Sequence, residues 1–356
     1  MAILSHLANT GILRRQGLPL SRFGRALLEA DHPTRTSGIT WHCTNVRWNA
    51  MSSSLQLSII VPHLNEPDDL RRCLRSLAAQ RADGVMFEII VVDNGSTTLP
   101  EEECRGIADL RLVRETAPGP GPARNLGARL ARAELLAFID ADCVAQDGWA
   151  KAVISAMSEL PDAAFAGGDI RINIAEPGRP TAIEAYEAIY AYDARAYIDR
   201  HGFAATGNMA VRKSVFEAVG PFGGIASMED TDWGQRATRS GYRGVFLADA
   251  KVMTPPCRSF RDLAKRWDRH VAHEFNQTDR RRLGGMLRWL LRAMIIAVSP
   301  LPEILRVLAS DRIAGVRNRL RAWACLTRVR FYRARRMMLV AMEGDATRLV
   351  ANWNRS

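Results

Sequence analysis

The chain has 356 residues and a formal charge of +11, enough length to bury one large domain with extensions. The charge is uneven: residues 52–255 carry 21 basic and 28 acidic side chains, whereas residues 256–356 carry 22 and 8. An acidic partner is therefore expected for the C-terminal region. The six cysteines form no Cys-x-x-Cys motif, which argues against a zinc site and fits reduced thiols in a cytosol.

Residues 1–54 show no strong periodicity, and we expect a disordered leader or a misassigned start. Met51 resembles a second start codon directly before the first apolar strand. The apolar stretches near the N-terminus are too short and broken for a standard signal peptide. A targeting role is the alternative interpretation.

From residue 57 onward, short apolar strands alternate with helices. The strands are expected at residues 57–62, 87–92, 110–113 and 135–139, and helices at residues 67–80 and 123–133. This alternation indicates an α/β domain over residues 55–256, with a mainly parallel sheet flanked by helices. Ligands bind such sheets beyond the carboxyl ends of the strands.

The most informative polar residues follow the strand at residues 135–139. Asp140 and Asp142 are spaced i, i+2, so both carboxylates can converge on one point at the end of a strand. Mg²⁺ or Mn²⁺ takes such oxygen ligands and often bridges to substrate phosphates. Polar segments also end two earlier strands, at residues 62–66 and 93–96. The pattern predicts a metal and a nucleotide diphosphate at this edge.

A second acidic group opens the helix expected at residues 231–240. Glu229, Asp230 and Asp232 suit the positive N-terminal end of that helix. Each is a candidate general base, a carboxylate that could take a proton from a bound substrate. The alternative is that all three only cap the helix.

Six pieces of sequence in this order resemble family 2 glycosyltransferases with the glycosyltransferase A fold. They lie at residues 58–66, 90–96, 121–125, 138–142, 207–210 and 229–232, so the resemblance spans about residues 57–255. It implies inverting transfer of a sugar from a nucleotide-diphosphate sugar to a hydroxyl acceptor. His63 departs from the pattern, because the family usually has a small hydroxyl residue there.

The resemblance also implies a role for each matched residue. Asp142 and Asp140 would hold the metal, Asp230 would be the base, and Glu229 would support the acceptor site. Gly207, Asn208 and Asp232 would line the acceptor side. The donor side would comprise Pro62, His63, Asn65, Glu66, Asp93, Gly95, Ser96, Arg124, Asn125 and Asp140.

Two rival functions remain open at this point. A sugar-nucleotide nucleotidyltransferase shares an α/β sheet and an acidic metal site, but it usually carries a glycine-rich basic loop after the first strand. Residues 62–66 lack such a loop. A non-catalytic nucleotide-sugar-binding protein with a decayed site is the second rival, and the intact Asp140, Asp142 and Asp230 argue against it.

Residues 257–356 are expected to form a basic, amphipathic helical extension. The longest uncharged run near residue 290, Ala293–Pro302, is ten residues, whereas a membrane span needs roughly 20. Arg288 and Arg292 share a helix face, and arginines alternate with apolar residues over 317–336, which favours an anionic membrane surface. Packing on the catalytic domain is one alternative, and nucleic acid, which we do not expect as a partner, is another. We therefore expect a cytoplasmic enzyme, peripheral on the inner face of the membrane, with a lipid-linked or saccharide acceptor in envelope polysaccharide or glycolipid synthesis.

Overall fold

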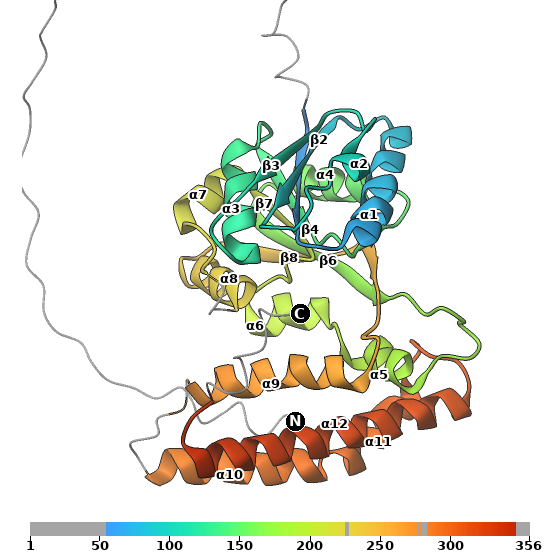
Figure 1. The fold of residues 1–356 in the computed structure, drawn as a ribbon, viewed down its shortest axis with the longest axis vertical. Helices are drawn as coiled ribbons and strands as arrows, with labels where there is room; N and C mark the ends of the chain where they lie inside the picture. The colour runs from blue at the N-terminus through green and yellow to red at the C-terminus, as the bar shows by residue number, and fades with distance from the viewer. Residues whose placement is uncertain (1–54, 225–227, 277, 279–282, 347–356) are drawn as a thin grey trace, which may run out of the picture. The chain divides into compact units, whose positions relative to one another are not determined.

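The computed structural model describes residues 55–224, 228–276, 278 and 283–346 (Figure 1). By its contacts the chain divides into two units, Met1–Arg47 and Trp48–Ser356, and every described residue belongs to the second. The leader expected at residues 1–54 lies outside the described residues. The strands are β1 (Leu57–His63), β2 (Phe87–Asp93), β3 (Leu110–Arg114), β4 (Leu135–Ile139), β5 (Val144–Ala145), β6 (Ala163–Ile172), β7 (Asn208–Arg212) and β8 (Arg243–Thr254).

Helices connect these strands and then form the C-terminal part of the described chain. They are α1 (Pro67–Ala79), α2 (Glu101–Cys104), α3 (Pro120–Leu130), α4 (Trp149–Glu159), α5 (Ala182–Tyr190), α6 (Ala194–His201), α7 (Lys213–Val219), α8 (Glu229–Arg239), α9 (Phe260–Asn276), α10 (Leu283–Val298), α11 (Pro300–Ala309) and α12 (Val316–Glu343), with a 3₁₀ turn η2 (Gln80–Asp83) after α1.

The strands form one mixed sheet in the order β3-β2-β1-β4-β7-β6-β8-β5. β3, β2, β1 and β4 run parallel to one another, as expected. β7 is antiparallel to both β4 and β6, while β8 is parallel to β6 and antiparallel to β5. The α/β class with a central sheet flanked by helices is therefore confirmed. The antiparallel pairings are what the sequence pattern did not predict.

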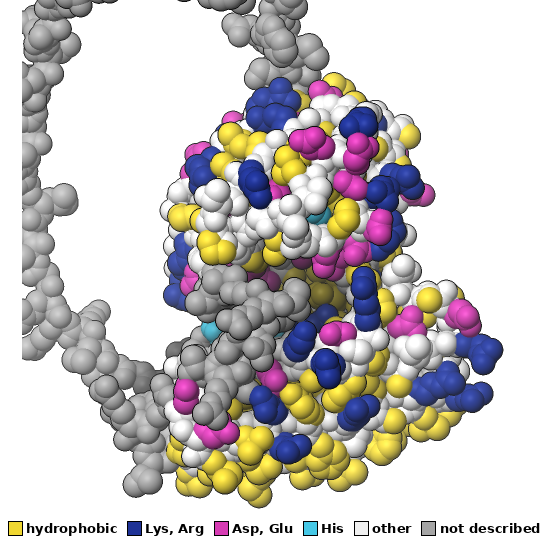
Figure 2. Space-filling view, in the orientation of Figure 1, with side chains coloured by type: hydrophobic (Ala, Val, Ile, Leu, Met, Phe, Trp, Pro, Cys, Tyr) yellow, Lys and Arg dark blue, Asp and Glu magenta, His cyan; other side chains and the backbone are white. Residues whose placement is uncertain are grey.

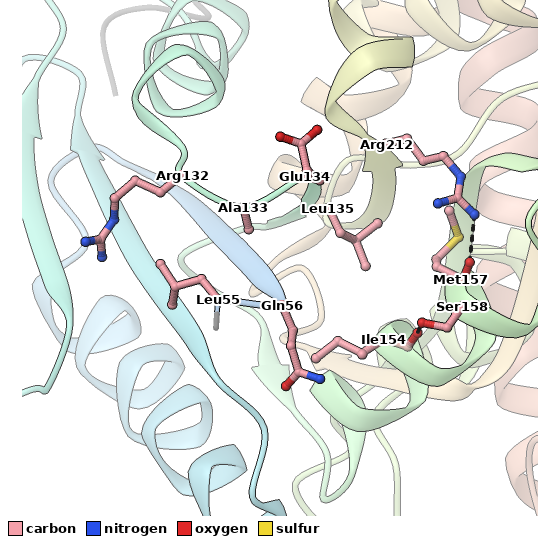
Figure 3. A pocket seen from close by; sticks show the side chains of 10 residues that line it. All are labelled: Leu55, Gln56, Arg132, Ala133, Glu134, Leu135, Ile154, Met157, Ser158 and Arg212. Carbon is pink, nitrogen blue, oxygen red and sulfur yellow. Dashed lines mark hydrogen bonds between the residues drawn. The ribbon is translucent and has the colours of Figure 1, made fainter. Parts of the chain in front are cut away.

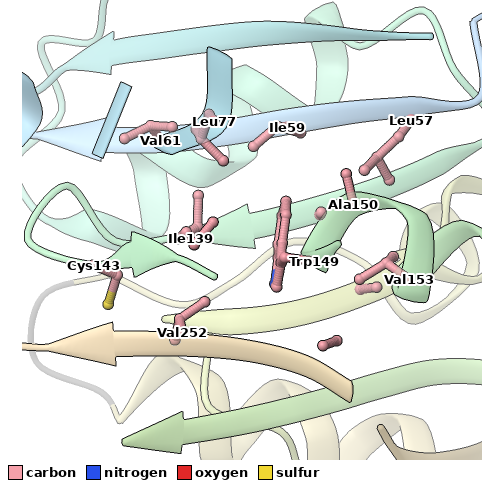
Figure 4. Close-up of a cluster of buried hydrophobic side chains, with 14 of the residues drawn as sticks. Leu57, Ile59, Val61, Leu77, Ile139, Cys143, Trp149, Ala150, Val153 and Val252 are labelled. Atoms are coloured by element: carbon pink, nitrogen blue, oxygen red, sulfur yellow. The ribbon is translucent and has the colours of Figure 1, made fainter. Parts of the chain in front are cut away.

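Alternate side chains of the central strands pack under helices on opposite faces of the sheet. Ile59 of β1 belongs to a buried cluster with residues of α1 and α4, part of which Figure 4 shows. Its neighbour Ile60 belongs to a second cluster with residues of α3, α7 and α8. Both isoleucines are fully buried, which explains why these strands are apolar on both faces.

Helix α3 begins earlier than the sequence pattern predicts. The sequence pattern predicts a helix from Ala123, but α3 starts at Pro120. A proline fits the first turn of a helix because the N–H group that it lacks has no partner there within the helix. With this start, Arg124 is the fifth residue of α3 rather than the second, about one turn inside the helix.

The C-terminal helices pack together and against α5. α12 contacts α5, α9, α10 and α11. One buried cluster joins residues of α5 and α12 to Leu263 and Val307, and another joins residues of α9, α10 and α12 around Trp289. The helical extension is present, as expected. Within the described residues, no helix is both long and apolar enough to cross a membrane.

Several arginines of this extension form ion pairs inside the fold. On α12, Arg333 donates to Glu274 at 2.8 Å and Arg336 donates to Asp268 at 2.9 Å, and both acids lie on α9. Arg330 lies 3.5 Å from Glu303 of α11. Part of the positive charge that we assigned to a membrane surface is thus engaged with acidic residues of the same helical layer.

Candidate active site

The polar segments that end β2, β1 and β4 lie next to one another, because these strands are neighbours in the sheet. Asp93 is the last residue of β2 and is fully buried. Its Oδ2 accepts hydrogen bonds from the backbone N–H groups of Gly95 and Ser96, each at 3.2 Å. Asp93 therefore shapes the turn that the resemblance assigns to the donor.

His63 is the last residue of β1 and faces the same turn. Its Nε2 accepts from the backbone N–H of Glu66 at 3.2 Å, so in the neutral ring the proton lies on Nδ1. Nδ1 lies 3.4 Å from Asp93 Oδ1 and 3.4 Å from Ser96 Oγ. The imidazole, 3% exposed, links the ends of β1 and β2 and occupies the space between them.

The loops after β1 and β2 are joined through Asn65. Its backbone N–H donates to Ser96 Oγ at 2.9 Å, and its Oδ1 accepts from the backbone N–H of Thr97 at 2.9 Å. Asn65 has a φ of 54°, a left-handed conformation that asparagine tolerates better than most residues. Glu66 is exposed directly before α1, and Pro62, half-buried, pairs with Val92 of β2. The loops form one platform.

Asp140 and Asp142 follow β4 in a tight turn, in which the backbone N–H of Cys143 donates to the Asp140 carbonyl at 3.0 Å. Burial, with repulsion from Asp140 and Glu66, raises the pKa of Asp142 to about 7. The Cys143 thiol lies 3.5 Å from Asp142 Oδ1. A bound cation would reduce the repulsion among these neighbouring carboxylates and would favour their ionised forms.

This arrangement fits a divalent ion held partly by substrate. The described residues contain no group of three or more His, Cys, Asp or Glu side chains placed to hold a metal. Mg²⁺ is often bound through one or two carboxylates, with water and substrate phosphates completing its shell. Asp142 and Asp140 supply that number of carboxylates.

Arg124 of α3 joins the two acidic groups of the site. Its Nη2 donates to Asp140 Oδ1 at 2.6 Å, and its Nη1 donates to Glu229 Oε1 at 2.9 Å. The residue is 3% exposed. Burial by itself lowers the pKa of Arg124, but the charges of Asp140 and Glu229 outweigh it and raise that pKa. The guanidinium therefore stays charged and fixes the end of β4 against the start of α8.

The three acids at the start of α8 have different surroundings. Asp230 is half-buried; burial and the charge of Glu229 raise its pKa, and the backbone N–H of Thr231 donates to its Oδ1 at 2.7 Å. Asp232 accepts from Arg236 of the same helix at 3.0 Å and is half-exposed. Among these acids, a raised pKa makes Asp230 the stronger base, while Asp232 has the surroundings of a helix-surface residue.

Two of the predicted ligand-binding amides bond to the protein itself. Asn208 is 2% exposed, donates to the carbonyls of Asp169 and Ala250, and accepts from the indole of Trp149 at 2.9 Å. Asn125 makes reciprocal hydrogen bonds with the backbone of Phe222. These contacts favour structural roles for both amides. They could not be read from the sequence, because their partners lie tens of residues away.

Gly207, in contrast, lies against the acid pair. A Cβ at this position would approach Asp140 Oδ2 to 3.0 Å, which is tighter than most side chains allow. The glycine therefore leaves room beside the Asp140 carboxylate. A larger residue at position 207 would push that carboxylate aside.

Helix α9 and the segment before α6 also lie near the acids of the site. Burial lowers the pKa of Arg269, partly offset by the charges of Glu229 and Asp230, so α9 lies near these two acids. Burial raises the pKa of Tyr192; the charge of Arg266 opposes this rise and the charge of Asp142 adds to it. No local motif marks Tyr192, since it lies 50 positions after Asp142 in the sequence.

A separate pocket of about 490 Å³ lies at the amino end of β4, around Arg132, Leu135 and Arg212 (Figure 3). Arg212 donates to the carbonyls of Met157, Leu160 and Ala163. Its guanidinium is thus engaged by backbone, and the pocket lies at the opposite ends of the parallel strands from the acids. We assign it no part in the chemistry.

A mixed sheet flanked by helices, with carboxylates beyond the carboxyl ends of its parallel strands, is the architecture of the glycosyltransferase A fold. The sequence profile described as Glycosyl transferase family 2 matches residues 58–220. Glycosyltransferase AglE of Haloferax volcanii is 31% identical over 223 residues, covering 61% of this chain and 72% of that protein. The chain belongs to glycosyl transferase family 2.

Other relatives agree with this assignment. The uncharacterized glycosyltransferase YibD of Escherichia coli is 36% identical over 96 residues, covering 26% of this chain and 27% of that protein. Among solved structures, the mannosyltransferase PcManGT of Pyrobaculum calidifontis, in complex with GDP-Man and Mn²⁺, aligns with a TM-score of 0.52. It is 18% identical and the alignment covers 81% of this chain and 87% of that one, which supports the fold. Family membership also decides against the nucleotidyltransferase alternative.

Proposed function

We propose that this chain is a metal-dependent, inverting glycosyltransferase that moves one sugar from a nucleotide-diphosphate sugar to a hydroxyl acceptor. The observation that carries the proposal is the double ion pair of Arg124, which ties Asp140 to Glu229. Through it, the acids that suit a metal and the acids that suit a base border one site. An inverting transfer needs those two groups on opposite sides of the sugar.

On the donor side, Asp142 and Asp140 would hold Mg²⁺ or Mn²⁺. The ion, when bound, would neutralise the diphosphate that leaves. The PcManGT structure with GDP-Man and Mn²⁺ is a precedent in a protein of the same fold. The platform of His63, Asn65 and Asp93 lies at the ends of β1 and β2, the next two strands along the sheet from β4, and would receive the nucleoside.

On the acceptor side, Asp230 would remove the proton of the attacking hydroxyl. Its raised pKa suits this function, because a carboxylate that binds protons more tightly is a stronger base. Glu229 would be held in place by the hydrogen bond from Arg124. The hydroxyl oxygen would attack the anomeric carbon from the face opposite the diphosphate, which inverts its configuration.

The acceptor and the location are proposed from the C-terminal region. Residues 256–356 carry 22 basic and only 8 acidic side chains, which supports a peripheral position at an anionic membrane surface. We take this surface to be the cytoplasmic face. A lipid-linked or saccharide acceptor for envelope polysaccharide or glycolipid synthesis fits that position. We do not expect nucleic acid as a partner.

The stereochemistry and the base are tested together. With a donor and acceptor pair found by screening, NMR of the first product should show the anomeric configuration opposite to that of the donor. Asp230→Asn should bind donor normally and slow transfer by roughly 10²-fold or more, the scale of general-base removal. Asp232→Asn is the matched control and should stay near the wild-type rate. Retained configuration would refute the mechanism, and an active Asp230→Asn beside a dead Glu229→Gln would move the base by one residue.

A further inference from the structure

Helix α10 is apolar on two faces, of which the fold uses one. Trp289, Ala293 and Ile296 are buried against α9 and α12, and the Trp289 indole donates to the Met337 carbonyl at 2.9 Å. On the other side, apolar residues recur at helical spacing and remain 50% to 69% exposed. They are Leu287, Leu291, Met294, Ile295 and Val298. A helix that only packed on a domain would present polar residues there.

Helix α11 continues this exposed face. Leu301, Leu305 and Leu308 recur at helical spacing and are 66%, 72% and 39% exposed. Only Ser299 separates α11 from α10. Figure 2 shows hydrophobic side chains gathered along the edge of the molecule where Figure 1 places α10 and α11. We call these eight residues, five on α10 and three on α11, the apolar stripe. Exposed patches of this kind mark interaction sites in soluble domains.

Helices α10 and α11 themselves carry almost no negative charge. The only acidic residue of α10 and α11 is Glu303. Its side chain is 13% exposed and accepts a hydrogen bond from the Tyr190 hydroxyl at 2.7 Å, so it faces the interior. The stripe therefore borders on no acid of its own helices, and an anionic surface could approach it without repulsion from them.

Arginines lie on the protein side of the apolar stripe. Arg292 lies 3.2 Å from Glu274 of α9 and is 52% exposed, and Arg306 lies 3.8 Å from Asp193 and is 54% exposed. Both guanidinium groups thus reach back toward the rest of the fold while remaining half in solvent. With the stripe in the acyl region of a bilayer, they would lie at the level of the headgroups, where arginine contacts lipid phosphate.

From these observations we propose that α10 and α11 lie flat in one leaflet of an anionic membrane with the apolar stripe inserted. The proposal rests on the peripheral location proposed above and specifies its contact, but it does not depend on the chemistry. Attachment through apolar insertion should survive high salt, because ionic strength screens charges and does not weaken apolar burial. The arginines of α12 that pair with acids of α9 and α11 contribute less than their number suggests.

The test is sedimentation of the full chain with phosphatidylcholine vesicles that contain about a third phosphatidylglycerol, followed by a wash in about 1 M salt. Wild-type protein should pellet and largely remain after the wash. Leu291→Glu with Leu305→Glu should leave most of the protein in the supernatant, because both changes place a charge in the acyl region. Met86→Glu is the matched control: Met86 is 43% exposed, lies before β2, and should behave like wild type.

An activity assay and a measurement of the oligomeric state complete the test. Release of nucleoside diphosphate from a soluble donor should be equal in the double variant and the wild type, which shows an intact fold and separates this proposal from the catalytic one. Equal sedimentation of the double variant and the wild type would overturn the proposal. A wild-type protein that does not bind vesicles would also overturn it. If that protein eluted as a dimer and the double variant as a monomer, the stripe would be a protein interface.

Discussion

At the scale of single residues, Asp142 is where burial and function conflict most. In solution an aspartate is ionised above about pH 4. Here burial and the charges of Asp140 and Glu66 raise the pKa of Asp142 to about 7. The folded, metal-free protein therefore retains a proton between about pH 4 and 7 that the unfolded chain releases. Stability from this group should increase as the pH falls through that window and should be lost as the pH rises through 7.

This gives a prediction for metal-free protein with Asp142→Asn as the reference, since asparagine has similar shape and no titration. The Tm of the wild type minus that of Asp142→Asn should rise as the pH is lowered from 8 to 5. Mn²⁺ should raise the wild-type Tm more at pH 8 than at pH 5, because the proton competes with the ion. Parallel pH profiles for the two proteins would show that Asp142 does not carry the shift.

At the scale of elements, Arg124 links three of them: α3, the end of β4 and the start of α8. Arg124→Leu removes both charge-assisted hydrogen bonds and leaves Asp140 and Glu229 in mutual repulsion. We expect kcat to fall roughly 10- to 100-fold, from the one to three kcal/mol that such bonds contribute. Arg124→Lys keeps the charge but cannot reach both carboxylates in the same fork, so it should recover only part of the rate.

A control for Arg124 is available on the surface. Arg243 lies 2.7 Å from Asp162, and both side chains are exposed, 57% and 72%. Exposed pairs contribute little, so Arg243→Leu should leave both kcat and Tm close to wild type. If Arg124→Leu lowered the Tm while the remaining folded enzyme kept its full kcat, Arg124 would be structural and the coupling of α3 to α8 would be wrong.

Only some of the strands could be predicted from the sequence. The four strands β1 to β4 were predictable because apolar runs bounded by polar turns have a direct local signal. The antiparallel half was not predicted, since the pairing of β7 with β4 and β6 depends on contacts between segments far apart in the chain. For the same reason, the structural role of Asn208 could not be predicted, because its hydrogen-bond partners lie on β6, β8 and α4. The position of Asp140 and Asp142 could be predicted, because it follows from β4 alone.

Charge in the C-terminal helices was the other point that local pattern could not resolve. The sequence shows that arginines alternate with apolar residues, but not which of them meet acids. In the fold, Arg333 pairs with Glu274 across 59 positions of sequence. Part of the apolar stripe could be predicted from the sequence, because apolar residues on α10 outnumber those that one buried face needs. Its continuity into α11 required the structure.

At the scale of the whole molecule, the two proposed functions lie in two layers. The acids lie in the layer formed by the sheet and the helices on its two faces. Helix α9 lies near Asp230 and also belongs to the helical layer that carries the apolar stripe on α10 and α11. This arrangement would hold the catalytic edge close to a membrane surface and suits an acceptor that is presented there. The metal and donor site proposed for the acids can be tested without an acceptor.

That test measures release of nucleoside diphosphate from a panel of nucleotide sugars, with Mn²⁺ or Mg²⁺ and with excess chelator. We expect release from at least one donor, and this release should require the divalent ion. It should be lost in Asp142→Ala while circular dichroism shows an intact fold. Release that continues undiminished in chelator, or in the folded Asp142→Ala protein, would contradict the assignment of this acidic edge as the metal and donor site.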